Sequence, residues 1–200
     1  MESVLFNKID ELLSRKQSTV IAIDGHSGAG KSTLAKKIKS HYCNNRDNNC
    51  NIISMDDFFL RPHQRTPERY AEPGGNIDYE RFAEEVMTPL LADDGNFSKP
   101  FTYRIYDCKS GGFGGEITVN PAKLTLIEGV YSMHPCFMEE FGIYDFTVFI
   151  DISEKMQRER LMTRNPILFD RFINEWLPME NKYFKAFGIA EKCDFVVHTD

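Results

Sequence analysis

Short apolar runs alternate with stretches of helical periodicity along most of the chain. The runs lie at residues 20–23, 52–55, 124–128, 146–151 and 195–197. Each is short and apolar enough to form a strand buried on both faces of a sheet. Between them, apolar residues recur at helical spacing, as in residues 2–16. There the apolar positions are Leu5, Ile9, Leu12 and Leu13. The alternation predicts an α/β fold with a mostly parallel sheet.

Residues 59–119 depart from this alternation, and we expect them to form an insertion on the substrate side. Prolines, glycines and arginines over residues 61–75 predict an extended loop without long regular structure. A helix should follow from residue 79, with apolar residues on one face. Those residues are Phe82, Val86 and Leu90.

Two further turns are predicted from polar and glycine-rich segments. Residues 44–49 read as a polar turn after the first long helix. Extended segments at 101–106 and 115–119 flank the glycine-rich turn Gly111–Gly115, which together predict a β-hairpin inserted into the core. No helix follows these glycines, so a flexible turn is favoured over a second phosphate-binding loop.

The strongest chemical signal is the glycine-rich segment after the first apolar run. It reads Gly25-His26-Ser27-Gly28-Ala29-Gly30-Lys31-Ser32 and matches Gly-x-x-x-x-Gly-Lys-Ser at every required position. In such a loop, backbone N–H groups surround the phosphates of a nucleotide. We expect ATP to bind residues 25–33, including Thr33, with Lys31 at the β- and γ-phosphates and Ser32 at Mg²⁺.

Acidic residues stand at the ends of two predicted strands. Asp56 and Asp57 follow residues 52–55, and Glu128 ends residues 124–128. In an open parallel sheet, ligands bind beyond the carboxyl ends of the strands. One of the two aspartates would then act as a catalytic base at this site. The alternative is an aspartate that only caps the next helix. Glu128 would help Ser32 to hold Mg²⁺, in place of the usual aspartate.

Arginines gather before a helix break near the end of the chain. They are Arg158, Arg160 and Arg164, followed by Asn165 and Pro166. The break predicts a helical lid whose arginines neutralise phosphate charge. A solvent-exposed face paired with Glu154 and Glu159 is the alternative. Four later aromatic residues are expected in the core, with a base-stacking platform as the alternative. They are Trp176, Tyr183, Phe184 and Phe187.

Polar side chains of the insertion are candidates for substrate contacts. Arg61, Arg65 and Arg69 would either grip an anionic part of the substrate or remain solvated. Asp78 would either cap the following helix or bind substrate hydroxyls. Four residues before the glycine turn could line the substrate pocket. They are Tyr103, Arg104, Tyr106 and Asp107.

Composition narrows the class of protein. The 200 residues suit one α/β domain, and the net charge of −6 argues against general binding to nucleic acid backbones. The five cysteines are scattered, without a C-x-x-C pair, which favours a reducing compartment. Neither a signal pattern nor an apolar run of membrane-spanning length occurs. We therefore expect a cytoplasmic protein without nucleic acid or membrane partners, and a homo-oligomer stays open.

These motifs, in this order, resemble those of the uridine kinase and phosphoribulokinase family of P-loop kinases, which includes nicotinamide riboside kinases. The matching segments are GHSGAGKST, SMDDFF, NID, YD, LIEGVY, the arginine-bearing lid and CDFVV. The resemblance implies that Asp56 is the general base, Phe59 an aromatic near the acceptor and Asp78 an acid for ribose hydroxyls. It likewise implies a substrate-pocket role for Tyr106, a magnesium role for Glu128 and lid roles for Arg160 and Arg164.

The chain departs from the family pattern at two places. Lys109, Ser110 and Gly111 stand where uridine kinases carry a histidine that reads the pyrimidine. Phe169-Asp170-Arg171 replaces the usual arginine-glycine pair of the lid. The first departure bears on the acceptor, and the second on the role of Arg171.

Together the residues and the resemblance predict one P-loop kinase domain over residues 1–200. It would have a three-layer fold, an inserted hairpin within about 59–119 and a lid at about 158–175. The predicted activity is transfer of the ATP γ-phosphate, with Mg²⁺, to a hydroxyl of a small nucleoside-like acceptor. A different, anionic hydroxyl acceptor and a nucleotide-binding regulatory NTPase are the alternatives.

Overall fold

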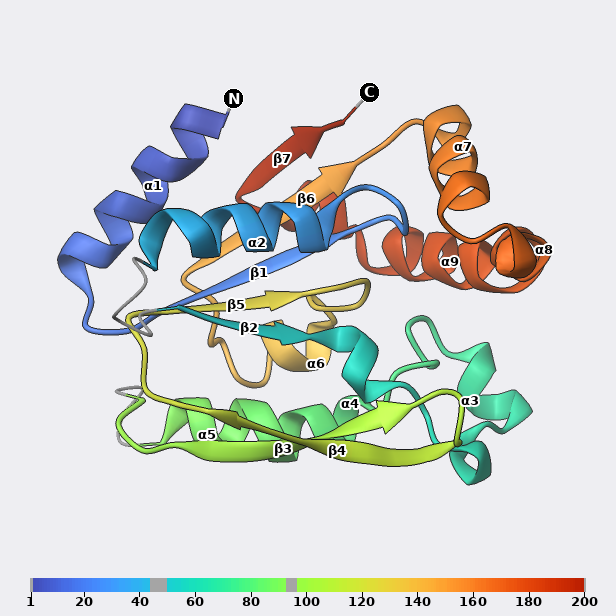
Figure 1. The fold of residues 1–200 in the computed structure, drawn as a ribbon, viewed down its shortest axis with the longest axis horizontal. Coiled ribbons are helices and arrows are strands. Elements are labelled where there is room, and N and C mark those ends of the chain that lie inside the picture. Colours follow the sequence, from blue (N-terminus) through green and yellow to red (C-terminus); the bar gives the residue numbers. More distant parts are fainter. Residues whose placement is uncertain (1, 44–49, 93–96, 200) are drawn as a thin grey trace.

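Five parallel strands form the central sheet of the computed structural model, which describes residues 2–43, 50–92 and 97–199 (Figure 1). Their order is β2-β5-β1-β6-β7. They are β1 (Thr19–Gly25), β2 (Cys50–Ser54), β5 (Leu124–Glu128), β6 (Phe146–Asp151) and β7 (Phe195–His198). Because β1 pairs with β5 on one side and β6 on the other, the phosphate loop and Glu128 leave the same edge. The predicted parallel sheet is confirmed.

Helices cover both faces of this sheet. They are α1 (Glu2–Arg15), α2 (Lys31–Tyr42), α6 (Pro135–Met138), α7 (Glu154–Arg164), α8 (Phe169–Arg171), α9 (Leu177–Phe187) and α10 (Ile189–Lys192). Side chains alternate along β1, so Ile21 and Ile23 pack with Leu5 of α1 in one apolar cluster. Ala22 packs in the other cluster with Tyr183 of α9. Two apolar clusters on opposite faces of one sheet make the predicted three layers.

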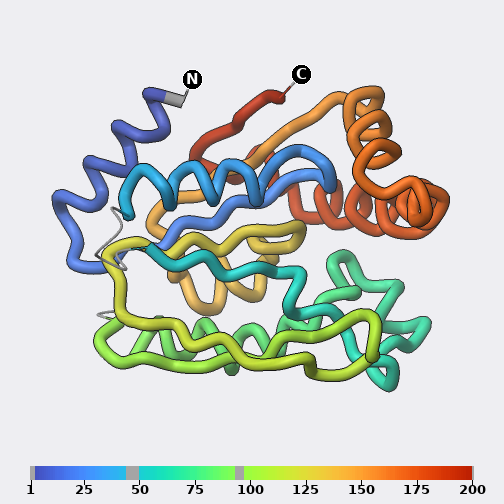
Figure 2. The backbone as a smooth tube through the Cα atoms, viewed as in Figure 1, coloured from blue at the N-terminus to red at the C-terminus, as the bar shows by residue number. Residues whose placement is uncertain are grey.

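The insertion forms a unit beside β2, at the edge of the sheet (Figures 1 and 2). It contains α3 (Pro67–Ala71), α4 (Tyr79–Phe82), α5 (Thr88–Leu91), β3 (Phe101–Asp107) and β4 (Gly112–Val119). A π-helical turn, Ala83–Met87, joins α4 to α5 into one continuous helix. Its predicted apolar face is buried, because Phe82, Val86 and Leu90 all lie in the core.

The hairpin differs from the prediction in the position of its turn. β4 begins at Gly112, so most of the predicted glycine turn is strand. The turn instead occupies residues 108–111, because the Asp107 carboxylate accepts hydrogen bonds from the backbone N–H groups of Lys109 (2.9 Å) and Ser110 (3.3 Å). Gly111 completes it with a positive φ of 71°.

The predicted turn at 44–49 lies outside the described residues. In the described part of the chain, the helices are too short or too polar to cross a bilayer.

Two glycines of the insertion allow a test of this packing. A Cβ on Gly75 would lie 1.9 Å from the backbone oxygen of Arg69, whereas a Cβ on Gly112 would meet nothing within 4 Å. Gly75→Ala should therefore lower the free energy of unfolding by about 2–3 kcal/mol, and Gly112→Ala should change it by less than about 1 kcal/mol. Urea denaturation measures both. Equal effects would contradict the described path of the insertion.

Candidate active site

A cavity of about 1100 Å³ opens at the carboxyl ends of β1, β2 and β5. The phosphate loop, both predicted strand ends and the lid contribute to its walls, as do residues of the insertion. The predicted site residues that line it are Ser27, Gly28, Gly30, Lys31, Ser32, Thr33, Asp56, Phe59, Glu128, Arg160 and Arg164. Segments far apart in sequence thus meet around one space.

The phosphate loop runs from β1 to the first turn of α2. Gly25 has a φ of 138°, and a Cβ there would lie 2.2 Å from the backbone oxygen of Ile150, so only glycine fits beside β6. The Lys31 side chain folds back along the loop, and its ammonium group donates to the carbonyls of Gly25 (2.8 Å) and His26 (2.9 Å). Gly25, His26 and Ala29 also belong to the loop, but they do not line this cavity.

Ser32 and Glu128 form the candidate magnesium site. The Ser32 hydroxyl lies 3.0 and 3.1 Å from the two carboxylate oxygens of Glu128. Burial raises the pKa of Glu128, and the hydrogen bond from Ser32 opposes this shift. A hydroxyl and one carboxylate fit Mg²⁺, which binds few protein oxygens beside phosphates and water. Within the described ranges, no group of three His, Cys, Asp or Glu residues could hold a metal by itself.

The two aspartates after β2 point to different surroundings. Both lie in a 3-10 turn, Met55–Phe58, whose N-cap is Ser54. Asp56 lines the cavity. Asp57 instead accepts a hydrogen bond from the Tyr103 hydroxyl at 3.1 Å, and burial raises its pKa. Of the two aspartates, only Asp56 lines this cavity.

The predicted lid lies over the phosphate loop. The Arg160 guanidinium donates to the backbone oxygens of Gly28 (3.2 Å) and Ala29 (3.4 Å), so α7 contacts the loop directly. Asn165 ends α7, and its side chain caps the following turn as predicted. Arg158 instead pairs with Glu154 at 2.9 Å on the outer face. The alternative of a solvent-exposed face paired with glutamates therefore holds for Arg158. Arg160 lines the cavity.

Trp176 differs from its predicted place in the core. It is half-buried and lines the cavity, and the Arg171 guanidinium lies over its ring at 4.8 Å from the centroid. Tyr183 is buried in the core as predicted. Trp176 ends a π-helical turn, Phe172–Trp176, that has no fully buried residue, and the buried face of α9 begins with the next residue, Leu177.

Two buried carboxylates at the loop were missed by sequence reasoning. Asp24, fully buried at the end of β1, accepts hydrogen bonds from the N–H groups of Gly25, Tyr131 and Met133 and from the Tyr183 hydroxyl. Burial raises its pKa to about 6, although these hydrogen bonds and nearby Lys31 oppose the shift. The only signal was an acid inside an apolar run.

The second missed carboxylate is Glu180, which is 4% exposed and lines the cavity from α9. Its two oxygens accept from the Ser27 N–H (3.0 Å) and the Ser27 hydroxyl (2.5 Å). Burial raises the pKa of Glu180. Glu180 shares a buried face of α9 with Leu177 and Tyr183. An acid on that apolar face was the available signal.

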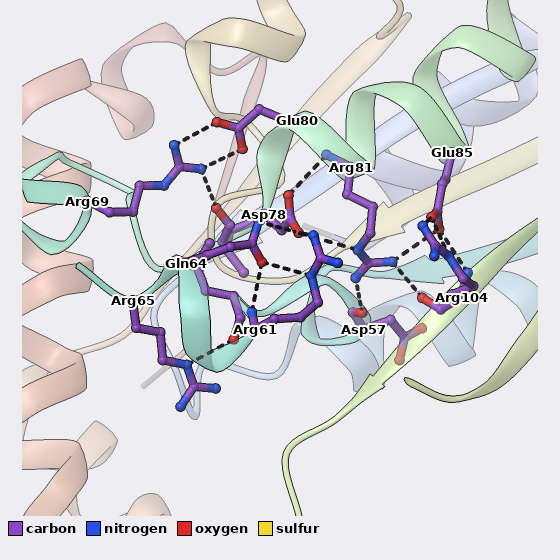
Figure 3. A network of polar contacts seen from close by, with 12 residues as sticks. Asp57, Arg61, Gln64, Arg65, Arg69, Asp78, Glu80, Arg81, Glu85 and Arg104 are labelled. Carbon is purple, nitrogen blue, oxygen red and sulfur yellow. Dashed lines mark hydrogen bonds and ion pairs between the residues drawn. The ribbon is translucent and has the colours of Figure 1, made fainter. Parts of the chain in front are cut away.

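Several predicted substrate residues lie outside the cavity lining: Asp78, Tyr103, Arg104, Tyr106 and Asp107. Asp78 is 2% exposed and caps α4, since its carboxylate accepts from the Arg81 N–H at 3.2 Å and from Gln64 at 2.9 Å. Its role toward substrate hydroxyls stays a prediction. Tyr106 is buried behind the cavity, and Arg104 pairs with Glu85 (Figure 3). The structure does not bring Arg104 to the site.

Comparison with known proteins agrees with this arrangement. The model of the phosphoribulokinase / uridine kinase family matches residues 20–166. Chloroplastic phosphoribulokinase of Spinacia oleracea is 28% identical over an alignment of 161 residues, which covers 72% of this chain and 38% of that protein. Uridine-cytidine kinase C of Dictyostelium discoideum is 30% identical over 130 residues, 63% of this chain and 26% of that protein.

A solved structure extends the likeness to nearly the whole chain. It is a possible uridine kinase from Bacillus stearothermophilus, 23% identical, with a TM-score of 0.64 over 98% of this chain and 99% of that one. At this identity the likeness shows the fold. This chain matches 38% or less of the length of the two curated relatives, so activity, substrates and partners do not transfer from them directly.

The raised pKa of Asp24 predicts a pH dependence of stability. Because the folded state binds this proton more tightly than the unfolded state, Asp24 stabilises the fold below about pH 4, and this contribution is lost as the pH rises through about 6. Relative to Asp24→Asn, the wild-type free energy of unfolding should fall by about 2 kcal/mol between pH 4 and 7. Urea denaturation at several pH values measures this difference. A difference that does not vary with pH would refute it.

Proposed function

The chain belongs to the phosphoribulokinase / uridine kinase family, and from this premise we propose that it is a kinase that uses Mg-ATP. It would transfer the γ-phosphate to a hydroxyl group of a small, nucleoside-like metabolite. The observation that supports this most directly is the convergence of Lys31, the Ser32–Glu128 pair and Asp56 on one cavity. These residues supply an anion site, a metal site and a base.

The surroundings of the loop support a full nucleotide. A second cavity of about 340 Å³ shares Gly30, Thr33 and Arg160 with the first. Its other lining includes apolar side chains. These are Leu5, Leu34, Ile150, Phe195 and Val197. A partly apolar cavity beside a phosphate loop suits the base of ATP. The large cavity, which Lys31 and Ser32 line, would then hold the phosphates and the acceptor.

Asp56 would orient the acceptor hydroxyl and take its proton as the oxygen attacks the γ-phosphorus. The new oxygen–phosphorus bond forms as the bond to the β–γ bridging oxygen breaks, and ADP leaves with that electron pair. Lys31 and Arg160 would stabilise the charge that develops on the phosphates. Bound Mg²⁺, held by Ser32 and Glu128, would neutralise β- and γ-phosphate oxygens. The lid would exclude water, so that hydrolysis does not compete with transfer.

Asp56→Asn should lower acceptor-dependent ATP consumption by about 100- to 10,000-fold, because the amide cannot take the proton. Mg-ATP binding, measured by calorimetry, should stay within about threefold, because Asp56 is not a loop residue. Lys31→Ala should lower both. Asp57→Asn is the matched control, since Asp57 contacts Tyr103 and does not line the cavity.

Wild-type turnover in Asp56→Asn would remove Asp56 as the base. ATP hydrolysis that no hydroxyl acceptor accelerates would instead favour a nucleotide-binding regulatory NTPase.

Glu128→Gln tests the metal site. The neutral amide binds Mg²⁺ less well than a carboxylate, so the Mg²⁺ concentration for half-maximal activity should rise about tenfold or more. Activity at saturating Mg²⁺ should recover in part. A titration of ATP consumption against Mg²⁺ measures this. An unchanged Mg²⁺ requirement would exclude Glu128 from the metal site.

A further inference from the structure

Most arginines of the insertion are neutralised within the protein (Figure 3). Arg61 lies 3.7 Å from the Asp78 carboxylate, and Arg69 lies 2.7 Å from that of Glu80. The other two share Glu85: Arg81 contacts it at 3.1 Å, and Arg104 binds its second oxygen. Each of these four arginines thus has a carboxylate within 4 Å, and none of them lines the large cavity.

Arg65 is the exception among the described arginines of the insertion. Its Nε donates to the Leu60 carbonyl at 2.9 Å, and its Nη2 donates to the Tyr106 hydroxyl at 2.7 Å. Both partners are neutral, and no carboxylate of the described residues lies within ion-pair distance. In Figure 3 its guanidinium lies apart from Asp78, Glu80 and Glu85. Arg65 also lines the large cavity.

Two neutral contacts orient this guanidinium and do not cancel its charge. A guanidinium has five N–H donors in a planar fork, and the hydrogen bonds to Leu60 and Tyr106 use two of those of Arg65. The remaining donors have the geometry that binds carboxylate or phosphate oxygens in pairs.

Lys109 adds a second cation to the same cavity. It lies in the hairpin turn, at the place where the chain lacks the histidine of uridine kinases. Its backbone N–H, like that of Ser110, donates to the Asp107 carboxylate. Within the described chain, the Lys109 ammonium forms no ion pair at 4 Å or less. The insertion thus presents to the cavity two cations that have no carboxylate within ion-pair distance among the described residues.

We propose that the acceptor carries an anionic group, a carboxylate or a phosphate, which Arg65 and Lys109 bind while its hydroxyl meets Asp56. The proposal rests on the proposed function for the identity of this ligand as the phosphate acceptor. It also gives Tyr106 a positioning role: the hydroxyl of Tyr106 holds the Arg65 fork, although the tyrosine itself does not line the cavity.

The chain supplies its own reporter for a binding test. It has one tryptophan, Trp176, and that residue lines the cavity. With Mg²⁺ and a non-hydrolysable ATP analogue on the protein, tryptophan fluorescence can follow titration with matched acceptors. The pairs are glycerol and glycerate, uridine and orotidine, and ribulose and ribulose 5-phosphate. The first two pairs test a carboxylate and the third a phosphate. The charged member of at least one pair should bind at least about tenfold more tightly.

Arg65→Gln should remove this preference. It should weaken binding of the charged member about tenfold or more and change the neutral member less than about twofold. Arg65→Lys should fall between, because it keeps the charge and loses the fork. Arg15→Gln is the charge-matched control, since Arg15 pairs with Glu11 on α1 and does not line the cavity.

Equal binding of neutral and charged members, binding of none, or an Arg65→Gln effect shared by both members would overturn the proposal. Turnover separates it from the proposed function. Charged acceptors that bind through Arg65 without receiving phosphate would refute the kinase and leave the anion site. A neutral acceptor that is phosphorylated in preference to charged ones would support the kinase and refute the anion site.

Discussion

The geometry of the site depends on one buried carboxylate, that of Asp24. It accepts hydrogen bonds from the start of the phosphate loop at Gly25, from Tyr131 and Met133 after β5, and from Tyr183 of α9. A fully buried acid is unfavourable unless such donors surround it. Tyr131 has a φ of 77°, a left-handed conformation that is costly for tyrosine, and its N–H bond to Asp24 helps to hold it there. The end of β1 and the segment after β5 are thus tied to one carboxylate.

Electrostatics around Lys31 follow from the same arrangement. Burial lowers the pKa of Lys31, whereas Glu180, Asp24, Asp56 and Glu128, in order of decreasing influence, favour its charged form. Lys31 is 8% exposed, and its ammonium group donates to two carbonyls of its own loop. Under the proposed function, it would exchange those bonds for phosphate oxygens when ATP binds. Preorganised charge of this kind needs little rearrangement during phosphoryl transfer.

The sequence predicted what local patterns encode. The phosphate loop, the strand-end acids and the break before Pro166 depend on neighbouring residues. Their motifs were therefore sufficient to locate these segments along the chain. Asp24 and Glu180 depend on partners more than 100 residues away, which no local pattern shows. Strand β3 illustrates a subtler failure. Simple alternation would place Arg104 and Tyr106 on one face, but a register shift between Ile105 and Tyr106 turns Tyr106 inward and leaves Arg104 exposed.

Under the proposed function, the residues for phosphate chemistry and those for acceptor recognition lie in separate parts of the structure. Arg81 of α4 is 4% exposed and donates to the backbone oxygens of Asp57 and Arg104, both at 2.7 Å, so it fastens the insertion to the end of β2. Its frame is therefore fixed relative to Asp56, the neighbour of Asp57. Arg65 and Lys109, which add positive charge to the cavity, lie on loops and not in the helices and strands that Arg81 fastens to β2. Under the proposed function, substitutions there would change which hydroxyl compound is held at Asp56 without disturbing Asp24 or the phosphate loop, because no contact of either within the described residues involves Arg65 or Lys109.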